Sequence, residues 1–382
     1  AIRDSSRFFT SEERAVKPIR LLHLSDLHLD HPLSAYGRAI RRELRSELIR
    51  SFDFIVDKAI SLGVDILLCA GDLICSRSVS DSTLDHVAQG FARLAKVGIT
   101  VACVPGEAEE HEGLEALRDL ADAANVHLFA GDEWSRIEPL PGLNIWGVRT
   151  TGRNASVSVL GNLRPDGQGI HIGLMHASTE DQPRGGKVLS TVTSAQLAAS
   201  GLHYLALGHY HSVLNCSTAT STCWYSGSPA HHDFSTRGER HVLKVTIGDG
   251  DVSVSRITVP GRPHRVVVVD VTGKTADSVR HRIASVANCQ HCLMVQLEGE
   301  LSPALAWLPA RLEREFSASF FHLSVTDNTH LAQATLPKGS VEAYVAASIG
   351  AGAGTHGRAL AIALSALEEV RPAERREDGS VG

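Results

Sequence analysis

Short apolar runs alternate with longer amphipathic stretches over the first two thirds of the chain. Residues 19–24, 64–70 and 99–104 are β-rich runs, whereas 38–63 and 84–98 place apolar side chains at helical spacing. The alternation continues with a helical stretch at 113–124 and with β-rich runs at 125–130, 143–148, 170–176 and 203–209. Strands that alternate with helices in this way predict a layered α/β domain.

The pattern changes beyond residue 212, where short strands follow one another with turn signals between them. The segment PGRPH at 260–264 marks a boundary, because proline removes a backbone hydrogen-bond donor and interrupts strand pairing. We therefore expect four parts in the chain. They are an N-terminal extension over 1–18, a main domain over 19–260, a smaller α+β domain over 261–350, and a hinge, a short helix (358–370) and a disordered tail over 351–382.

Composition narrows the class of protein. The 382 residues carry a net charge of −6, so the chain has no overall basic field and any binding to nucleic acid must be local. No apolar run reaches the ~20 residues of a membrane span, which predicts a protein with no membrane partner. Seven cysteines, an odd number in a chain of this size, do not suggest a disulfide framework. These features favour the reducing cytoplasm.

Carboxylates and histidines follow five of the predicted strands. These candidate metal ligands are Asp26, His28, Asp72, Glu107, His176, His209 and His211. In extended backbone, residues i and i+2 point to the same side, so the first two and the last two can each present a pair of donors to one cavity. Each motif alone is more often a surface turn or a packed histidine. Seven oxygen and nitrogen donors together suit two ions of Mn, Fe or Zn that share one carboxylate.

The series SDLHLD (25–30), GDL (71–73), PG (105–106), His176 and GHYH (208–211) resembles the calcineurin-like metallophosphoesterase superfamily. Within it, HLSDLHLD, the run from AGDL to ACVPG, and LALGHYHS resemble the DNA-repair exonuclease branch of the Mre11 and SbcD nucleases. The resemblance covers residues 19–260, and the second unit fits the capping domain of that branch by position. It implies an α/β fold, a layered β-sandwich flanked by helices, with a smaller α+β capping domain.

The resemblance also implies a ligand set of two divalent ions, with Mn preferred and Fe or Zn as alternatives. Asp72 would bridge the two ions. The first ion would be held by Asp26, His28, Asp72 and His211, and the second by Asp72, Glu107, His176 and His209. The partners it implies are DNA, an ATPase of the Rad50/SbcC kind that could dock on the helix 358–370, and a second copy of the chain. Packing of that helix on its own domain is the alternative.

One motif departs from the family pattern. The third motif of the family reads Gly-Asn-His-Asp/Glu, whereas this chain has Gly106-Glu107-Ala108-Glu109. Glu107 can still bind a metal through oxygen, but Ala108 cannot transfer a proton or contact the leaving oxygen. We expect metal binding with reduced turnover, by ~10²–10⁴ in rate. His111 is a candidate catalytic substitute, and the alternative is an exposed loop histidine.

Three functions fit these observations. The leading hypothesis is a metal-dependent phosphodiesterase that acts on DNA, a nuclease with attenuated turnover. The second is a catalytically weak scaffold subunit that binds DNA or a partner ATPase on the same fold. The third is a small-molecule phosphodiesterase, and the capping unit favours a polymeric substrate over it only by analogy with the family.

Overall fold

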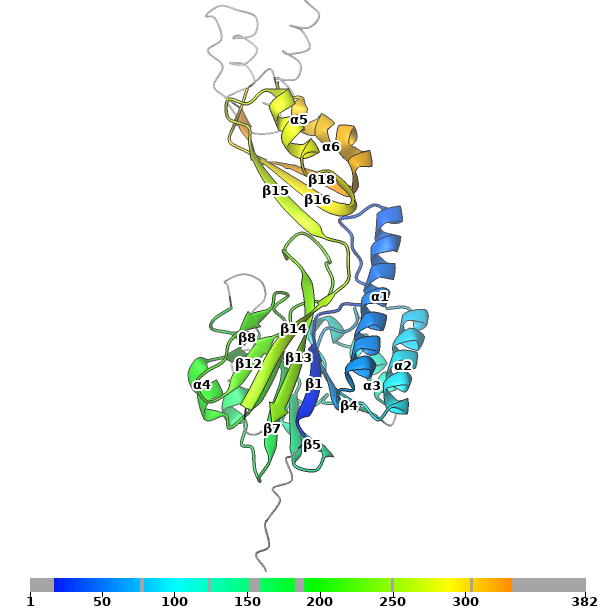
Figure 1. Ribbon diagram of the computed structural model, residues 1–382, viewed down its shortest axis with the longest axis vertical. Coiled ribbons are helices and arrows are strands. Elements are labelled where there is room, and N and C mark those ends of the chain that lie inside the picture. Colours follow the sequence, from blue (N-terminus) through cyan, green and yellow to red (C-terminus); the bar gives the residue numbers. More distant parts are fainter. Residues whose placement is uncertain are drawn as a thin grey trace, which may run out of the picture. The chain divides into compact units, whose positions relative to one another are not determined.

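The computed structural model describes residues 17–75, 79–122, 125–150, 159–182, 189–248, 251–302 and 305–331. Most of the predicted N-terminal extension, the hinge and the helix 358–370 lie outside the described residues. Contacts divide the described chain into two units (Figure 1). Unit 1 comprises 17–232 and 239–261, and unit 2 comprises 233–238 and 262–331.

Unit 1 contains two six-stranded sheets. The first has the order β14-β13-β1-β2-β3-β4, and the second has the order β11-β12-β10-β7-β6-β5. The strands of the first sheet are β1 (Ile19–Leu24), β2 (Ile66–Ala70), β3 (Thr100–Val104), β4 (Val126–Leu128), β13 (Arg240–Gly248) and β14 (Asp251–Val259). Those of the second are β5 (Ser135–Leu140), β6 (Leu143–Val148), β7 (Ile170–His176), β10 (Tyr204–Gly208), β11 (Leu214–Asn215) and β12 (Thr222–Tyr225). The central strands β1 to β4 are parallel, as are β6, β7, β10 and β12.

The central strands alternate their side chains between two cores. In β1, Leu21 packs between the sheets, whereas Leu22 and Leu24 pack under the helices. Phe52 of α1 (Arg38–Leu62) and Phe91 of α2 (Asp81–Lys96) belong to this helical core, which α3 (Glu112–Ala121) also covers. A third core lies on the outer face of the second sheet and includes α4 (Ser194–Ala199). The result is the predicted α/β sandwich of two sheets flanked by helices.

Capping interactions decide where helix α1 ends and where helix α2 begins. Helix α1 ends at Leu62 because Gly63 adopts the left-handed conformation, with φ 55°, and its N–H caps the carbonyls of the last turn. The pattern of apolar residues predicts the second helix from residue 84, but α2 begins at Asp81. The reason is that the Ser80 side chain accepts a hydrogen bond from the N–H of Thr83 and caps the first turn.

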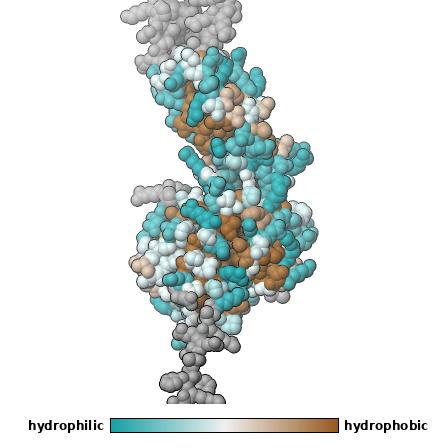
Figure 2. Space-filling model, viewed as in Figure 1, coloured by the Kyte–Doolittle hydropathy of each residue, from teal (hydrophilic) through white to brown (hydrophobic). Residues whose placement is uncertain are grey.

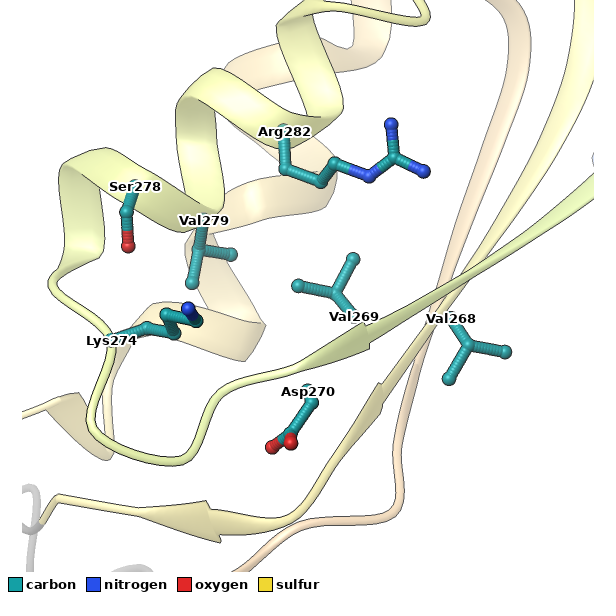
Figure 3. A pocket seen from close by; sticks show the side chains of 7 residues that line it. All are labelled: Val268, Val269, Asp270, Lys274, Ser278, Val279 and Arg282. Atoms are coloured by element: carbon teal, nitrogen blue, oxygen red, sulfur yellow. The ribbon is translucent and has the colours of Figure 1, made fainter.

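Unit 2 is a small layer of helices on a parallel sheet. Its sheet has the order β15-β16-β18, and α5 (Ala276–Ala284) and α6 (Leu308–Phe316) make the crossovers that parallel strands require. The strands are β15 (His264–Asp270), β16 (Asn288–Glu298) and β18 (Phe320–Asp327), with short strands β17 (Glu300–Leu301) and β19 (His330–Leu331). A surface pocket of about 290 Å³ lies between β15 and α5, with Lys274 and Arg282 in its lining (Figure 3). In the described part of unit 2, no three metal-ligating side chains come together.

Two further short strands of unit 1, β8 (Ser178–Thr179) and β9 (Thr191–Val192), pair with each other beside the second sheet. Among the described helices, none combines the length and the apolar character that a membrane crossing needs.

Candidate metal centre

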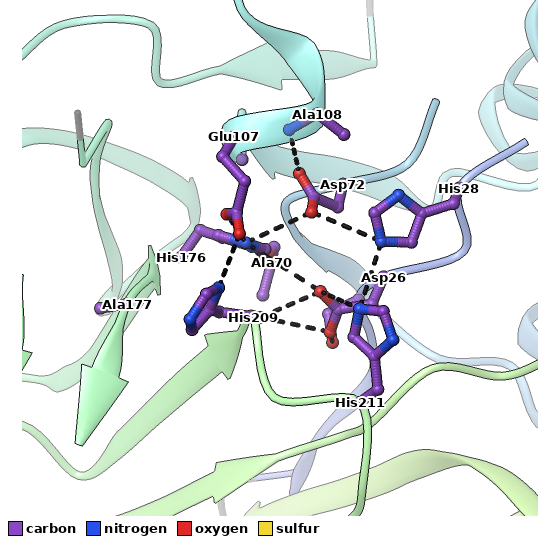
Figure 4. Close-up of polar contacts among 12 residues, drawn as sticks. Asp26, His28, Ala70, Asp72, Glu107, Ala108, His176, Ala177, His209 and His211 are labelled. Carbon is purple, nitrogen blue, oxygen red and sulfur yellow. Dashed lines mark hydrogen bonds and ion pairs between the residues drawn. The ribbon is translucent and has the colours of Figure 1, made fainter. Parts of the chain in front are cut away.

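All seven predicted metal ligands meet at the ends of parallel strands of the two sheets (Figure 4). Asp26 and His28 follow β1, and Asp72 follows β2. Glu107 begins the 3-10 turn after β3, His176 is the last residue of β7, and His209 and His211 follow β10. Carboxyl ends of parallel strands lie at one edge of a sheet, and open α/β sheets place their ligand sites there.

The backbone at the site is held in an unusual conformation. Asp26, His28, Asp72 and His209 have positive φ angles of 54°, 49°, 54° and 101°. Residues with a side chain rarely adopt such angles, which cost on the order of 1 kcal/mol or more each and concentrate at functional sites. Hydrogen bonds between the loops fix them, because the N–H of Asp26 donates to the Gly71 carbonyl at 3.0 Å and that of His28 to the Asp72 carbonyl at 2.9 Å.

A buried carboxylate joins the loop after β2 to the loop after β3. The Oε2 of Glu109 accepts the N–H groups of Asp72 at 3.0 Å and Gly106 at 2.8 Å. Its Oε1 accepts those of Leu73 at 2.6 Å and Ile74 at 3.0 Å. Glu109 therefore fixes the turn that presents Asp72.

The first group of donors is formed by Asp26, His28 and His211, whose ligand atoms lie within 4.8 Å of one another. The Nε2 of His211 is 3.3 Å from the Nε2 of His28 and 3.9 Å from the Oδ1 of Asp26. The Asp26 carboxylate is fully buried and is oriented by the N–H of His209, at 3.0 Å, and by the hydroxyl of Ser25, at 2.5 Å.

The second group is formed by Glu107, His176 and His209. The Oε1 of Glu107 lies 2.8 Å from the Nδ1 of His209, and its Oε2 lies 2.6 Å from the Nε2 of His176. The ring of His176 is fully buried, and its Nδ1 lies 2.8 Å from the Ala70 carbonyl. That contact directs the Nε2 toward the carboxylates.

Asp72 lies between the two groups. Its Oδ2 is 3.4 Å from the Nε2 of His28 and 3.5 Å from the Nε2 of His176. Its Oδ1 accepts the N–H of Ala108 at 2.8 Å. Gly106 makes this approach possible, because a Cβ at that position would collide with the Asp72 carboxylate.

The donor atoms fit divalent cations. His176 Nε2 and Glu107 Oε2 lie 2.6 Å apart as an ion pair, and neither buried atom has a further hydrogen-bond partner among the described residues. A divalent ion held by both atoms would take the place of the proton between them, because metal ligands bind in their deprotonated form. Carboxylate oxygen and imidazole nitrogen without thiolate are a typical donor set for Mn, Fe or Zn.

The electrostatics of the cluster also favour a cation. Burial raises the pKa of the Asp72 carboxyl well above its usual value, and the charges of Glu107, Glu109 and Asp26 raise it further against the opposing effect of His176. Burial alone would lower the pKa of His176, but the carboxylates of Asp72, Glu107 and Asp26 outweigh it and raise that pKa well above 6.5. Crowded carboxylates thus retain protons that a divalent ion would displace.

The pKa of Glu107 is shifted in the opposite direction. Burial by itself would raise the pKa of Glu107, but contacts with His176 and His209 dominate and hold that pKa well below its usual value. Glu107 is therefore a charged carboxylate between two imidazoles. Glu107, which stands where the family motif has a neutral asparagine, thus lies in one group of donors with His176 and His209.

Two histidines that the sequence pattern did not single out lie beside the first group. The ring centroid of His232 is 5.0 Å from that of His28, 5.7 Å from that of His211 and 5.2 Å from that of His31. The Nε2 of His232 lies 3.0 Å from the Leu27 carbonyl. Burial lowers the pKa of His28 well below its usual value, and the neighbouring histidines His232, His211 and His31 add to this effect.

His111, the predicted catalytic candidate, lies at the start of α3 with an exposed side chain. No hydrogen bond or ion pair links its imidazole to the seven donors within the described chain. Its catalytic role stays a prediction. Ala108 contributes its backbone N–H to Asp72, so this residue has a structural contact although it has no proton to transfer.

The sequence reasoning missed Glu109 and His232. The signal for Glu109 was its place as the last residue of the third motif, but a loop with four carboxylates gives no pattern that tells which one points inward. The signal for His232 was the adjacent pair His231-His232, and both of these histidines are buried.

The chain resembles several known proteins over part of its length. The chain is 26% identical over 247 residues to the uncharacterized metallophosphoesterase YhaO of Bacillus subtilis, a match that covers 62% of this chain and 59% of that protein. It is 21% identical over 266 residues to the DNA double-strand break repair protein Mre11 of Methanosarcina mazei, covering 68% of this chain and 41% of that protein. The chain thus spans less than two thirds of the length of these curated relatives.

Among solved structures, a dimetal phosphatase from Danio rerio matches with 12% identity and a TM-score of 0.37, covering 63% of this chain and 99% of that structure. The model of the calcineurin-like phosphoesterase family matches residues 19–213, just over half of the chain. That span contains every one of the seven donors. The chain belongs to the calcineurin-like phosphoesterase family.

Proposed function

We propose that the protein is a two-metal phosphodiesterase that acts on DNA. The observation that carries this proposal is the position of Asp72, whose Oδ2 lies 3.4 Å from the Nε2 of His28 and 3.5 Å from the Nε2 of His176. One carboxylate oxygen between two groups of donors is the arrangement that a pair of ions needs if they share a ligand.

We assign the donors to two divalent ions, with Mn preferred and Fe or Zn as alternatives. Asp26, His28, Asp72 and His211 would hold one ion, and Asp72, Glu107, His176 and His209 would hold the other. When bound, such ions polarise a phosphodiester and lower the pKa of a bound water.

The residues around the donors keep the site in position. The N–H of His209 orients the Asp26 carboxylate, and the Ala70 carbonyl orients the His176 ring. Glu109 fixes the turn that carries Asp72. Because these contacts exist in the protein chain itself, little rearrangement is needed when a ligand binds.

The third motif supports reduced turnover. At the position of the family histidine stands Ala108, which offers only a backbone N–H, and that group is bonded to Asp72. The loss of one proton donor or electrostatic contact lowers a rate by ~10²–10⁴. A catalytically weak scaffold that binds DNA or a partner is therefore the second candidate.

DNA is proposed as substrate because the chain is similar to proteins named for DNA double-strand break repair, and because unit 2 follows unit 1 in the sequence, as the capping domain of that branch does. We retain 19–260 as the metallophosphoesterase domain and 261–350 as the capping domain within this proposal. Docking to an ATPase of the Rad50/SbcC kind, formation of a homodimer and a cytoplasmic location belong to the same proposal.

The deciding experiment incubates the purified protein with Mn²⁺ and three substrates: single-stranded DNA, double-stranded DNA and bis-p-nitrophenyl phosphate. The Asp72→Asn variant is the matched control, because it preserves shape and removes the shared charge. Metal-dependent cleavage of DNA that this variant loses supports the proposal. Cleavage of the small ester alone supports a small-molecule phosphodiesterase, and metal binding without any cleavage supports the scaffold.

A further inference from the structure

The first two turns of α1 carry four arginines on one side of the helix. Arg38, Arg41, Arg42 and Arg45 follow the spacing i, i+3, i+4, i+7, which places them within one face. Arg38 and Arg42 are exposed, and Arg41 and Arg45 are partly buried. We call these four residues the arginine face. They line a surface hollow of about 780 Å³ together with Asp30.

The charge of the arginine face is not neutralised within the described chain. The two acidic residues of the same helix segment, Glu43 and Glu47, both pair with Arg50, at 2.9 and 3.7 Å. None of the four arginines forms an ion pair with a described carboxylate. The first turn of α1 also contains no acidic residue, so the partial positive charge of the helix start adds to the field.

Among the described residues that line this hollow, Asp30 is the one carboxylate, and its side chain is engaged with Ser80. Its Oδ2 accepts the N–H and the hydroxyl of Ser80, both at 2.9 Å. Asp30 therefore anchors the start of α2 and leaves the arginine face with a net positive charge. The space-filling view shows hydrophilic residues over much of the visible surface, with apolar patches among them (Figure 2).

Two arginines are positioned by the loop that carries metal ligands. The Nε of Arg45 donates to the carbonyl of His31 at 3.1 Å, and a terminal nitrogen of Arg41 donates to the carbonyl of Tyr36 at 3.0 Å. The ring of His31 lies 6.0 Å from the ring of His28, centroid to centroid. The Nε of Arg41 is buried and has no hydrogen-bond partner among the residues described. The arginine face is thus attached to the loop that carries His28, one of the predicted metal ligands.

We propose that the arginine face binds the phosphate backbone of a nucleic-acid strand that leads into the metal centre. This inference rests on the proposed function and names a binding surface for its substrate. From Arg38 to Arg45 the helix rises about 10 Å, the length over which one strand of a DNA duplex presents about three phosphates. Guanidinium groups bind phosphate oxygens through paired hydrogen bonds, which suits arginine better than lysine.

A nucleic acid fits this surface better than an acidic protein segment does. The lining of the hollow offers mainly charged groups and few apolar side chains, whereas a folded protein partner usually needs apolar anchors. Asp30, which lines the hollow, is two residues from the predicted ligand His28, so the hollow and the metal centre share one loop. Backbone contacts of this kind position a substrate and carry no sequence preference.

The test uses the double variant Arg38→Gln/Arg42→Gln, which changes the two exposed arginines and keeps the two that bond backbone carbonyls. The matched control is Arg50→Gln/Lys58→Gln, which removes the same charge from the same helix but from outside the arginine face. Binding of a short fluorescein-labelled DNA duplex is measured by fluorescence anisotropy in Ca²⁺ over a series of salt concentrations, with thermal unfolding as the check on folding.

We expect the double variant to bind DNA about 10- to 100-fold more weakly at 0.1 M salt and to lower the slope of log K against log salt by about two, whereas the control keeps both values. Arg38→Lys/Arg42→Lys keeps the charge but loses the paired hydrogen bonds, so it should keep the salt slope and bind with an affinity between those of the wild type and the glutamine variant.

Unchanged DNA binding and salt slope in Arg38→Gln/Arg42→Gln would overturn the proposal, even if the protein proves to be a nuclease. Failure of the wild type to bind DNA, or competition by poly-L-glutamate as strong as that of DNA, would overturn it as well. DNA that is bound through these arginines but never cleaved would support the surface and remove the catalytic proposal, so the two failures are distinguishable.

Discussion

Replacing Glu109 with glutamine tests whether a single buried carboxylate holds the metal centre together. Glutamine has nearly the same shape, but one of its two terminal atoms is an NH₂ group. Whichever oxygen is replaced, two backbone N–H groups then face a donor: those of Asp72 and Gly106 at Oε2, or those of Leu73 and Ile74 at Oε1. The substitution therefore leaves two buried donors without an acceptor.

The size of the effect follows from these four bonds. Each hydrogen bond to a charged group contributes ~1.5–3 kcal/mol, so the loss of two amounts to ~3–6 kcal/mol. Burial raises the pKa of the Glu109 carboxyl, although the backbone N–H groups of Gly106, Ile74 and Leu73 partly oppose this shift. A neutral glutamine avoids part of the cost of burying the charge, so we expect a net loss of ~2–4 kcal/mol in the free energy of unfolding.

Urea unfolding of the metal-free protein measures this loss, and elemental analysis after Mn²⁺ loading measures whether the Asp72 turn is still in place. Glu110→Gln is the matched control, because Glu110 is exposed and adjacent, and we expect its effect to stay within ~0.5 kcal/mol. If Glu109→Gln unfolds like the control and retains as much Mn²⁺ as the wild type, Glu109 does not position Asp72 and the reasoning fails.

Three further predictions concern the metal centre. Asp72→Ala should cause substantial loss of both Mn²⁺ ions, because both groups of donors share this carboxylate; elemental analysis that shows unchanged metal content would exclude the shared ligand. The pair Glu107→Asn and Ala108→His should raise cleavage of bis-p-nitrophenyl phosphate by about one to three powers of ten, with His111→Ala as the test of whether a substitute acid already acts; no gain from the pair together with no loss in His111→Ala would contradict the catalytic account of this loop. Because the pKa of His176 is raised above 6.5, its protonated form contributes stability that is complete below pH 6.5 and disappears as the pH rises through the folded-state value. Urea unfolding of the EDTA-treated protein should therefore show falling stability from neutral to alkaline pH, and saturating Mn²⁺ should remove the trend; a stability that rises over this range would refute the assignment.

The positions of the seven donors could be predicted because they depend on strand order. Apolar runs locate the parallel strands, and the residues that follow such strands must meet at one edge of the sheet. Asp26, Asp72 and His209 are examples, since each comes within two residues of a strand end. The same argument explains why the layered α/β fold could be predicted and is confirmed.

Other features depend on geometry that no periodic pattern reports. The 3-10 turn after β3 directs Glu107 toward His176 and Glu109 toward the backbone of the Asp72 turn, but sequence spacing alone does not distinguish these from Glu110, which is exposed. Strand β5 went unpredicted because its sequence SRIEPL combines two charged residues with a proline, and an edge strand tolerates both. Tertiary contacts decide such positions.

The third motif separates the ability to form the centre from the ability to turn over a substrate. Ala108 supports Asp72 through its backbone N–H, a contact that any residue except proline can make, so alanine in place of the family histidine leaves the Asp72 carboxylate in position. Glu107 lies against both His176 and His209 through its two oxygens, so it completes the second group of donors with an added negative charge. That charge strengthens attraction for a divalent cation and opposes an anionic phosphodiester at the same place. A positive surface outside the centre, such as the arginine face, would offset this repulsion at a distance from the metals. A chain with this third motif therefore depends more on remote contacts for substrate binding than one whose second group of donors is neutral at this position.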